Sequence, residues 1–179
     1  MELLATIFVP ILGAFMNRLR GGWLRDKVQW GTQEARFVSW GVPSGLIAAA
    51  FGVDPYVSSL VAIAAFLGCV FGQYQSLSMG HRGGRTGYKP WLFMGLWGLL
   101  RVAPIAAVLA LFTDFSVVPL VLAGIACPLV YHCVWYVPGQ CFIKGFGYGD
   151  GPSTGYDPPE LAEAIHGYLL VLGLILSIT

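Results

Sequence analysis

The chain has 179 residues, of which 56% are hydrophobic and only 11% are charged. A soluble domain carries about 25% charged residues, so the polar side chains here are too few to cover a water-exposed globule. Together with a formal net charge of +1, this composition argues against a soluble enzyme, a disordered tail and a nucleic-acid-binding domain with a broad basic face. The composition predicts an integral membrane protein.

Long apolar runs define the predicted elements. A bilayer core about 30 Å thick needs roughly 20 apolar residues per helix, and the runs here are continuous rather than alternating, which favours helices. We therefore predict an all-α fold, a single polytopic transmembrane helical bundle over residues 1–179. Its expected helices, about six in number, cover residues 3–16, 37–53, 57–73, 91–112, 116–137 and 161–178.

The first run is expected to be a retained helix. It lacks the basic n-region of a cleavable signal peptide, and its positive charges follow the apolar residues instead. Pro10 lies inside this run, and Pro43 lies inside the second run beside two glycines. The N-terminus of this first helix is predicted to lie on the non-cytoplasmic side of the membrane.

The ten Lys and Arg residues indicate the orientation of the bundle. All but Arg101 follow the first, third or fifth predicted helix, whereas the short connections 54–56 and 113–115 contain an acid and no base. The positive-inside rule therefore places the three long loops in the cytoplasm and both termini on the other side of the inner (plasma) membrane. Tryptophans near the cytoplasmic helix ends are interpreted as an interfacial aromatic belt: Trp23, Trp30, Trp40, Trp91 and Trp135.

The three long loops combine basic, glycine and aromatic residues in the segments 17–23, 81–89 and 144–151. Glycine-rich backbone beside basic side chains can bind anions. These side chains either grip the anionic inner leaflet, at roughly 1 kcal/mol each, or converge on one phosphate. Neither glycine run matches a nucleotide-binding motif, and we expect no cofactor. The predicted anion-binding residues are Arg20, Arg82, Arg85 and Lys144.

Three of these basic residues also share a regular spacing. The dipeptides that begin at Arg20, Arg82 and Lys144 are each 62 residues apart. The spacing has two interpretations, a threefold hairpin repeat or three hairpins that happen to have equal lengths.

Arg101 falls about ten residues into the fourth predicted helix. An arginine at this depth costs ~2.5–3.5 kcal/mol on insertion scales, so a partner is expected. Glu163, one turn into the last helix, is the nearest plausible counter-charge. An Arg101–Glu163 pair is interpreted either as a structural clamp or as part of a site.

The last helix also presents Glu160, Glu163 and His166 at intervals of three residues. Glu-x-x-His is half of the motif used in di-metal bundles, but no second copy occurs, so we predict no metal site. The four cysteines form no CxxC pair and are interpreted as buried small residues: Cys69, Cys127, Cys133 and Cys141.

Several short motifs resemble small polytopic inner-membrane proteins of tailed bacteriophages and prophages. They are residues 17–22 and 94–101, the glycine-rich stretch 146–151 and the acidic start of the last helix, 157–160. Proteins of this kind have no assigned activity, so the resemblance implies a membrane location and no catalytic residue.

The sequence favours a non-enzymatic membrane protein whose Arg- and Gly-rich cytoplasmic face binds anionic lipid or a protein partner, which includes a second copy of the chain. The role would be modification of the host envelope during phage infection. One alternative is a membrane-embedded enzyme acting on a phosphorylated lipid; another is a transporter or pore lined by Arg101. The candidate acid–base residues of the enzyme alternative are His81, Asp150, Asp157, Glu163 and His166.

Overall fold

The computed structural model describes the backbone of residues 2–19, 34, 36–86, 90–131 and 158–179, and the side chains of residues 4–16, 34, 36–71, 98–127, 165 and 167–179. This part of the chain contains six α-helices and one π-helical segment, which confirms the predicted all-α fold. The elements are α1 (Glu2–Leu19), η2 (Phe37–Gly41), α3 (Val42–Ala50), α4 (Pro55–Thr86), α5 (Pro90–Phe112), α6 (Val118–Tyr131) and α8 (Pro158–Ile178).

The predicted boundaries agree best where helix-breaking residues close an apolar run. The helix predicted over 91–112 is α5, and the one predicted over 161–178 is most of α8. The prediction for 37–53 is wrong in detail, because a π-helical turn comes first and the α-helix ends at Ala50. The fifth predicted helix begins at Val118, and its residues 132–137 lie outside the described part of the chain.

The largest correction concerns α4. It begins at Pro55 and continues to Thr86, so the prediction that His81, Arg82 and Arg85 lie in a loop is wrong. Hydropathy falls after residue 73, but a helix continues as long as its backbone hydrogen bonds can form, and no proline occurs between Pro55 and Pro90. The glycines in this stretch each weaken a helix by about 1 kcal/mol without forbidding it.

The turn between α3 and α4 shows why these helices end where they do. Gly52 has a φ of 86°, a left-handed conformation that suits glycine and commonly ends a helix. The Asp54 carboxylate then accepts hydrogen bonds from the backbone N–H groups of Tyr56 and Val57, at 2.9 and 3.3 Å, and so caps α4. Pro55 follows at the first helical position, where no N–H is needed.

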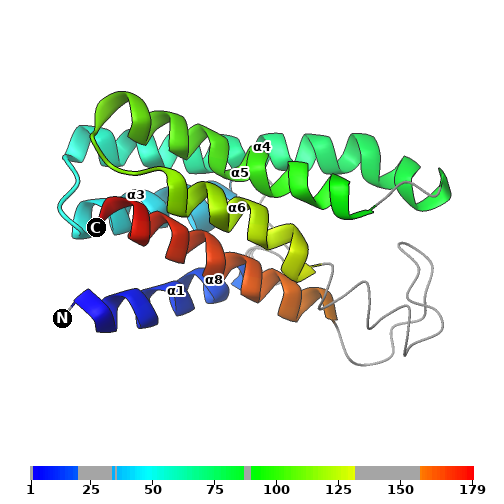
Figure 1. The fold of residues 1–179 in the computed structure, drawn as a ribbon, viewed down its shortest axis with the longest axis horizontal. Coiled ribbons are helices and arrows are strands. Elements are labelled where there is room, and N and C mark those ends of the chain that lie inside the picture. Colours follow the sequence, from blue (N-terminus) through cyan, green and yellow to red (C-terminus); the bar gives the residue numbers. More distant parts are fainter. Residues whose placement is uncertain (1, 20–33, 35, 87–89, 132–157) are drawn as a thin grey trace.

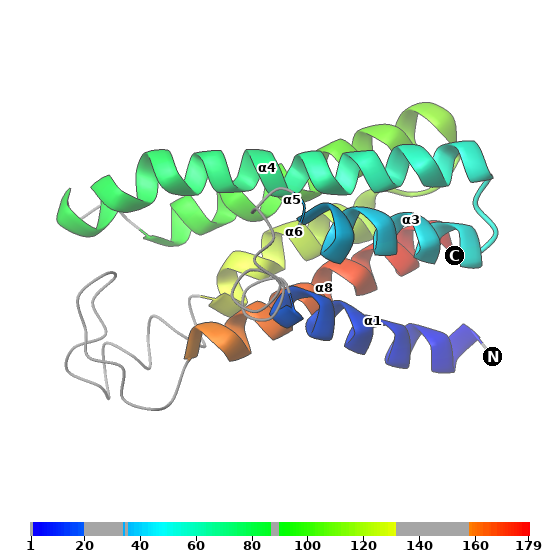
Figure 2. The ribbon, with the colours of Figure 1, turned by 180° about the vertical axis from the view of Figure 1, so that it is seen from behind.

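The helices form an elongated bundle (Figures 1 and 2). α4 lies along α5, α5 along α6, α6 along α8, and α8 along α1. η2 and α3 pack mainly on α4 and also contact α1 and α8, so the order of neighbours closes on itself. All these helices contribute to one apolar core, whose most deeply buried large side chains include Val61, Val102, Leu109, Leu120, Leu174 and Ile175.

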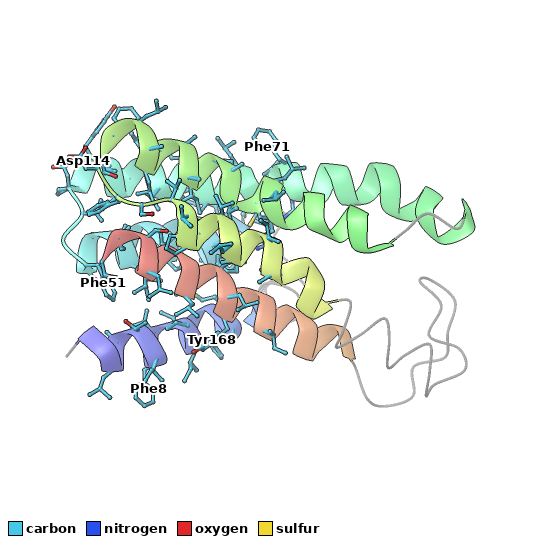
Figure 3. The ribbon with its side chains drawn as sticks, in the orientation of Figure 1. Phe8, Phe51, Phe71, Asp114 and Tyr168 are labelled. Carbon is cyan, nitrogen blue, oxygen red and sulfur yellow. The ribbon has the colours of Figure 1, made fainter. Side chains whose placement is uncertain are left out.

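Both ends of the chain lie at the same end of the bundle as the two short connections, residues 51–54 and 113–117 (Figure 1). Phe51 and Asp114 mark these connections in Figure 3. We call this the acidic end, because Asp54 and Asp114 are exposed there. α4 finishes and α8 begins at the opposite end, the basic end, where the last turns of α4 carry Arg82 and Arg85. The termini and the two acid-containing connections therefore share one end of the bundle, and the side of a membrane that this end faces stays a prediction.

Glycine allows the helices to approach closely at each of the main contacts. A Cβ atom on Gly45 would lie 2.8 Å from both the Ala62 Cβ and the Ser58 carbonyl oxygen of α4. Comparable contacts join α4 to α5 at Gly68, α1 to α8 at Gly13, α5 to α6 at Gly124 and α6 to α8 at Gly173. Small residues at helix contacts are typical of helices that associate in lipid, although soluble bundles also use them.

Helix length varies within the bundle. At 1.5 Å per residue, the 32 residues of α4 span about 48 Å and the 23 residues of α5 about 35 Å. Within the described residues, no helix combines the length and the apolar character needed to cross a membrane. The structure therefore confirms the all-α part of the predicted fold and leaves its transmembrane part unsupported.

Candidate functional site

Most of the predicted site residues have no described side chain. Arg20, Lys144, Asp150 and Asp157 lie outside the described residues altogether, and so do the 62-residue partners 20–21 and 144–145. The backbone places His81, Arg82 and Arg85 in α4, and Glu163 and His166 in α8. Since α4 ends and α8 begins at the basic end (Figure 1), the fold brings both groups toward the same end of the bundle. Their roles in anion binding or catalysis stay predictions.

Arg101 lies inside α5, as predicted, and its side chain is only 3% exposed. Its Nη2 donates a hydrogen bond to the Cys69 Sγ of α4 over 3.2 Å. Its guanidinium carbon lies 4.9 Å from the centre of the Trp40 ring, within range of a cation–π contact. The side chain of Glu163 lies outside the described residues, so the Arg101–Glu163 pair stays a prediction.

The sequence brings Cys69 and Arg101 together through a glycine. Gly68, the residue before Cys69, packs against the backbone of Arg101, and a Cβ atom there would overlap the Arg101 carbonyl oxygen. The backbones of α4 and α5 therefore approach more closely at this level than any side chain larger than glycine's would allow. This close approach carries the Cys69 thiol to the guanidinium.

A second arginine reaches the same region from η2. Arg36 directly precedes η2 and is 5% exposed, and Trp40, four residues later, shares its helix face. The π-helical turn is closed by a hydrogen bond from the Val42 N–H to the Phe37 carbonyl oxygen. Pro43, just beyond, has no N–H to continue the α-helical pattern. π-helical turns often occur at functional sites.

Trp40 corrects one prediction. It was expected in an interfacial aromatic belt, but it is 4% exposed and lies beneath the Arg101 guanidinium. The side chains of the other tryptophans assigned to the belt lie outside the described residues. A tryptophan at a helix end is compatible with either location, and only the packing of η2 on α4 decides between them.

We call Arg36, Trp40, Cys69 and Arg101 the buried arginine cluster. The charges of Arg36 and Arg101 lie close enough to influence each other, and Cys69 lies within electrostatic range of Arg36 as well. Cys127 of α6 is also within range of Arg101. Burying a charge costs free energy unless the charge is paired and hydrogen-bonded. Because two guanidiniums are buried here, we treat this region as a candidate site.

The described cysteines agree with their predicted role. Cys69 and Cys127 are both free thiols and both buried, which confirms the interpretation of these two as small buried residues; Cys133 and Cys141 lie outside the described residues. Among the side chains that the structure describes, no three His, Cys, Asp or Glu residues group closely enough to hold a metal ion.

Two features were missed from the sequence. Arg36 was counted among the loop charges, and only the packing of η2 reveals that its side chain is buried. An aromatic group also occurs at the acidic end, where Tyr56 and Phe112 pack edge to face at 6.3 Å between ring centres. Phe115 is exposed nearby in the sequence. The clue was available, since all three lie beside the two short connections.

Comparison with known proteins gives no relative, because no protein family, no curated protein and no solved structure matches the chain. The site is therefore interpreted from its own chemistry.

Proposed function

We propose that this chain is a non-enzymatic, multi-pass protein of the inner membrane, whose basic end faces the cytoplasm and binds anionic lipid or a protein partner. The side surface of the assembled bundle, rather than the hydropathy of any one helix, supports this proposal. The short motifs that resemble phage-encoded membrane proteins suggest a role in modifying the host envelope.

The observation that carries the proposal is the large number of apolar side chains exposed on the bundle. Large apolar side chains are exposed on every described helix; Phe8 of α1 and Phe71 of α4, for example, point away from the bundle in Figure 3. Leu111 of α5 is 77% exposed. A soluble monomer rarely exposes so many large apolar side chains, whereas a surface in contact with lipid consists largely of them.

The charged residues have the complementary distribution. Among the side chains that the structure describes, the exposed charges are Glu34, Asp54 and Asp114, which all lie outside the regular middle of the helices. The two described basic side chains, Arg36 and Arg101, are buried. Charges in membrane proteins almost always face the bundle interior or the aqueous ends, so this distribution fits a bundle surrounded by hydrocarbon.

The surface between α6 and α8 adds to this support. A shallow groove of about 200 Å³ runs between these helices and is lined by apolar residues that include Leu122, Leu172 and Leu176. Alanine and glycine occupy the positions where the two helices come closest, as at Ala123 and Gly173. Because the lining is apolar, an apolar chain is a better occupant of this groove than water.

The basic end is the proposed contact with anionic lipid. α4 is about 18 Å longer than a hydrocarbon core of about 30 Å, so its last turns would extend beyond the core. Arg82 and Arg85 lie in those turns, and Arg20 and Lys144 follow other predicted helices on the same side. Basic residues next to an anionic leaflet contribute about 1 kcal/mol each.

A second candidate function is transport of an anion through the bundle. The burial of two arginines in the interior specifically favours it, because intramembrane charges commonly line substrate or ion paths.

Extraction from isolated membranes tests the proposal. We expect the protein to remain with the membrane in alkaline sodium carbonate and to be released only by detergent, because the apolar side surface would be in contact with lipid. A peripheral protein held by its basic residues alone would be released by carbonate or by high salt. Release under either condition would contradict the proposal.

A further inference from the structure

α1 packs against the bundle by one face only. It lies along α8 and makes a smaller contact with η2, and it forms an edge of the bundle in Figures 1 and 2. Pro10 and Met16 are buried on its inner face, where Gly13 makes the close contact with α8. The opposite face meets no other helix in the described part of the chain.

This opposite face consists of large apolar side chains. We call it the α1 outer face, and each of its six side chains is between 46% and 61% exposed: Leu4, Ile7, Phe8, Ile11, Leu12 and Phe15. Among the side chains that the structure describes, no other helix exposes as many large apolar ones. Phe8 points away from the bundle in Figure 3. The face is also uncharged, because α1 contains no charged residue between Glu2 and Arg18.

The α1 outer face has the spacing of a helix that pairs with a second helix. Leu4 and Ile11 are seven residues apart, and so are Phe8 and Phe15. In chain order the four residues follow at intervals of four, three and four, which is the a/d pattern of paired helices. The outward face of any α-helix recurs at similar intervals, so the spacing is compatible with a helical partner, and the area of the face is the stronger argument.

The area of the α1 outer face matches what a stable pair of copies requires. A large side chain presents about 200 Å² when it is fully exposed, so the six exposed fractions amount to roughly 650 Å² per copy. The largest apolar patch on a typical monomer is only about 300–600 Å². Two copies that covered this face on each other would bury about 1,300 Å² in total, within the range of about 1,200–2,000 Å² for stable interfaces.

A second copy of the chain suits this face better than a different protein. None of the six side chains has a charge or a hydrogen-bonding group that would select a partner of another kind. An interface around a two-fold axis needs only one patch that is complementary to itself, and a uniformly apolar helix face meets this requirement.

We propose that the chain forms a symmetric dimer through the α1 outer face, with the two α1 helices side by side. Phe8 and Ile11, near the middle of the face, lie at the centre of this interface. The dimer goes beyond the proposed binding of lipid or a partner at the basic end and concerns a different surface. It assigns one face of the bundle to a second copy, and the rest of the side surface keeps its proposed contact with lipid.

Sedimentation equilibrium of the full chain in a density-matched, uncharged detergent tests the dimer. Phe8→Ala and Ile11→Ala should each raise the dissociation constant by about tenfold or more, because each removes a large side chain from the centre of the interface. Phe71→Ala and Ile63→Ala are the matched controls. They remove the same side chains from α4, where these are 48% and 50% exposed, and should leave the dissociation constant unchanged.

Two results would overturn the proposal. One is a chain that stays monomeric at every concentration, which would leave lipid as the cover of the α1 outer face. The other is a dimer that the two α4 controls weaken as much as the two α1 variants do. Neither result bears on the membrane location, which extraction with carbonate tests separately.

A cysteine variant keeps the proposal testable if an alanine variant fails to fold. Ile11→Cys changes one exposed position and should form a disulfide-linked dimer in isolated membranes under mild oxidation. Ile63→Cys and the unsubstituted protein should not form one. Equal cross-linking of Ile11→Cys and Ile63→Cys would contradict the proposal.

Discussion

The inside and the outside of the bundle can be compared on a single helix. On α5, Leu109 is completely buried and Leu111, two residues later, is 77% exposed. Eight residues before Leu109, on the same helix, Arg101 is buried with it. Hydropathy therefore does not separate core from surface in this protein. Large apolar side chains occur both in the core and on the surface, whereas the close glycine contacts and the two described arginines lie in the interior.

The largest expected effect is the loss of packing in the interior. Leu109→Ala should lower the free energy of unfolding by about 2–5 kcal/mol, because it leaves a cavity. Leu111→Ala removes the same atoms from an exposed position and should change the free energy of unfolding by no more than about 0.5 kcal/mol. Reversible unfolding in mixed micelles, followed by circular dichroism, measures both. Equal losses would mean that the bundle packs differently from the structure.

Charge on the side surface should show what surrounds the bundle. Ile63 of α4 is 50% exposed, and Ile63→Lys should raise the apparent free energy of membrane insertion by about 2.5–3.5 kcal/mol if it faces hydrocarbon. Ser59→Lys, one turn nearer the acidic end, should cost clearly less. An insertion assay in microsomes gives both values. In a water-exposed bundle, neither substitution should matter by more than about 0.5 kcal/mol.

The contact between Gly68 and the Arg101 backbone predicts whether an alanine at this position lowers or raises the stability of the protein. Gly68→Ala should destabilise the protein by about 1–3 kcal/mol, because the added Cβ would overlap the Arg101 carbonyl oxygen. Without this contact, alanine would stabilise the helix by up to about 1 kcal/mol. Ala103→Gly, at an exposed position of α5, gives the cost of glycine where no contact is involved. The same unfolding assay decides the sign.

The smallest expected effect is the loss of lipid affinity when a basic residue at the basic end is replaced. Arg82→Gln and Arg85→Gln should each weaken the binding of an anionic lipid by about fivefold, which corresponds to about 1 kcal/mol per residue. Native mass spectrometry in a mild detergent, with phosphatidylglycerol and phosphatidylcholine compared, measures the retained lipid. Asp114→Asn at the acidic end is the control and should change nothing. Equal retention of both lipids would argue against this surface.

The sequence was sufficient for the all-α fold and for the position of α5, but not for every helix boundary. α5 was predicted almost to the residue, because its apolar run lies between Pro90 and the polar Thr113-Asp114 pair. α4 was predicted too short, since hydropathy reports where a chain is apolar and not where its backbone hydrogen bonds stop. The π-helical turn at η2 was missed for the same reason.

The buried arginine cluster could be predicted only in part. Arg101 stood out because it interrupts a long apolar run, but its contact with Cys69 joins residues 32 positions apart. Such a contact depends on which helices are neighbours, and the chain alone did not reveal that α4 and α5 meet at Gly68. Arg36 looked like one of several loop charges until the packing of η2 buried it.

Cysteine accessibility in intact cells tests the central claim most directly. Leu122 and Asp114 are both exposed on the isolated bundle, so a bundle surrounded by water would leave both positions accessible. We predict that a membrane-impermeant maleimide labels Asp114→Cys from outside and does not label Leu122→Cys, even after the cells are permeabilised. Labelling of Leu122→Cys at the rate of Asp114→Cys would show that water surrounds the bundle, and would contradict the account.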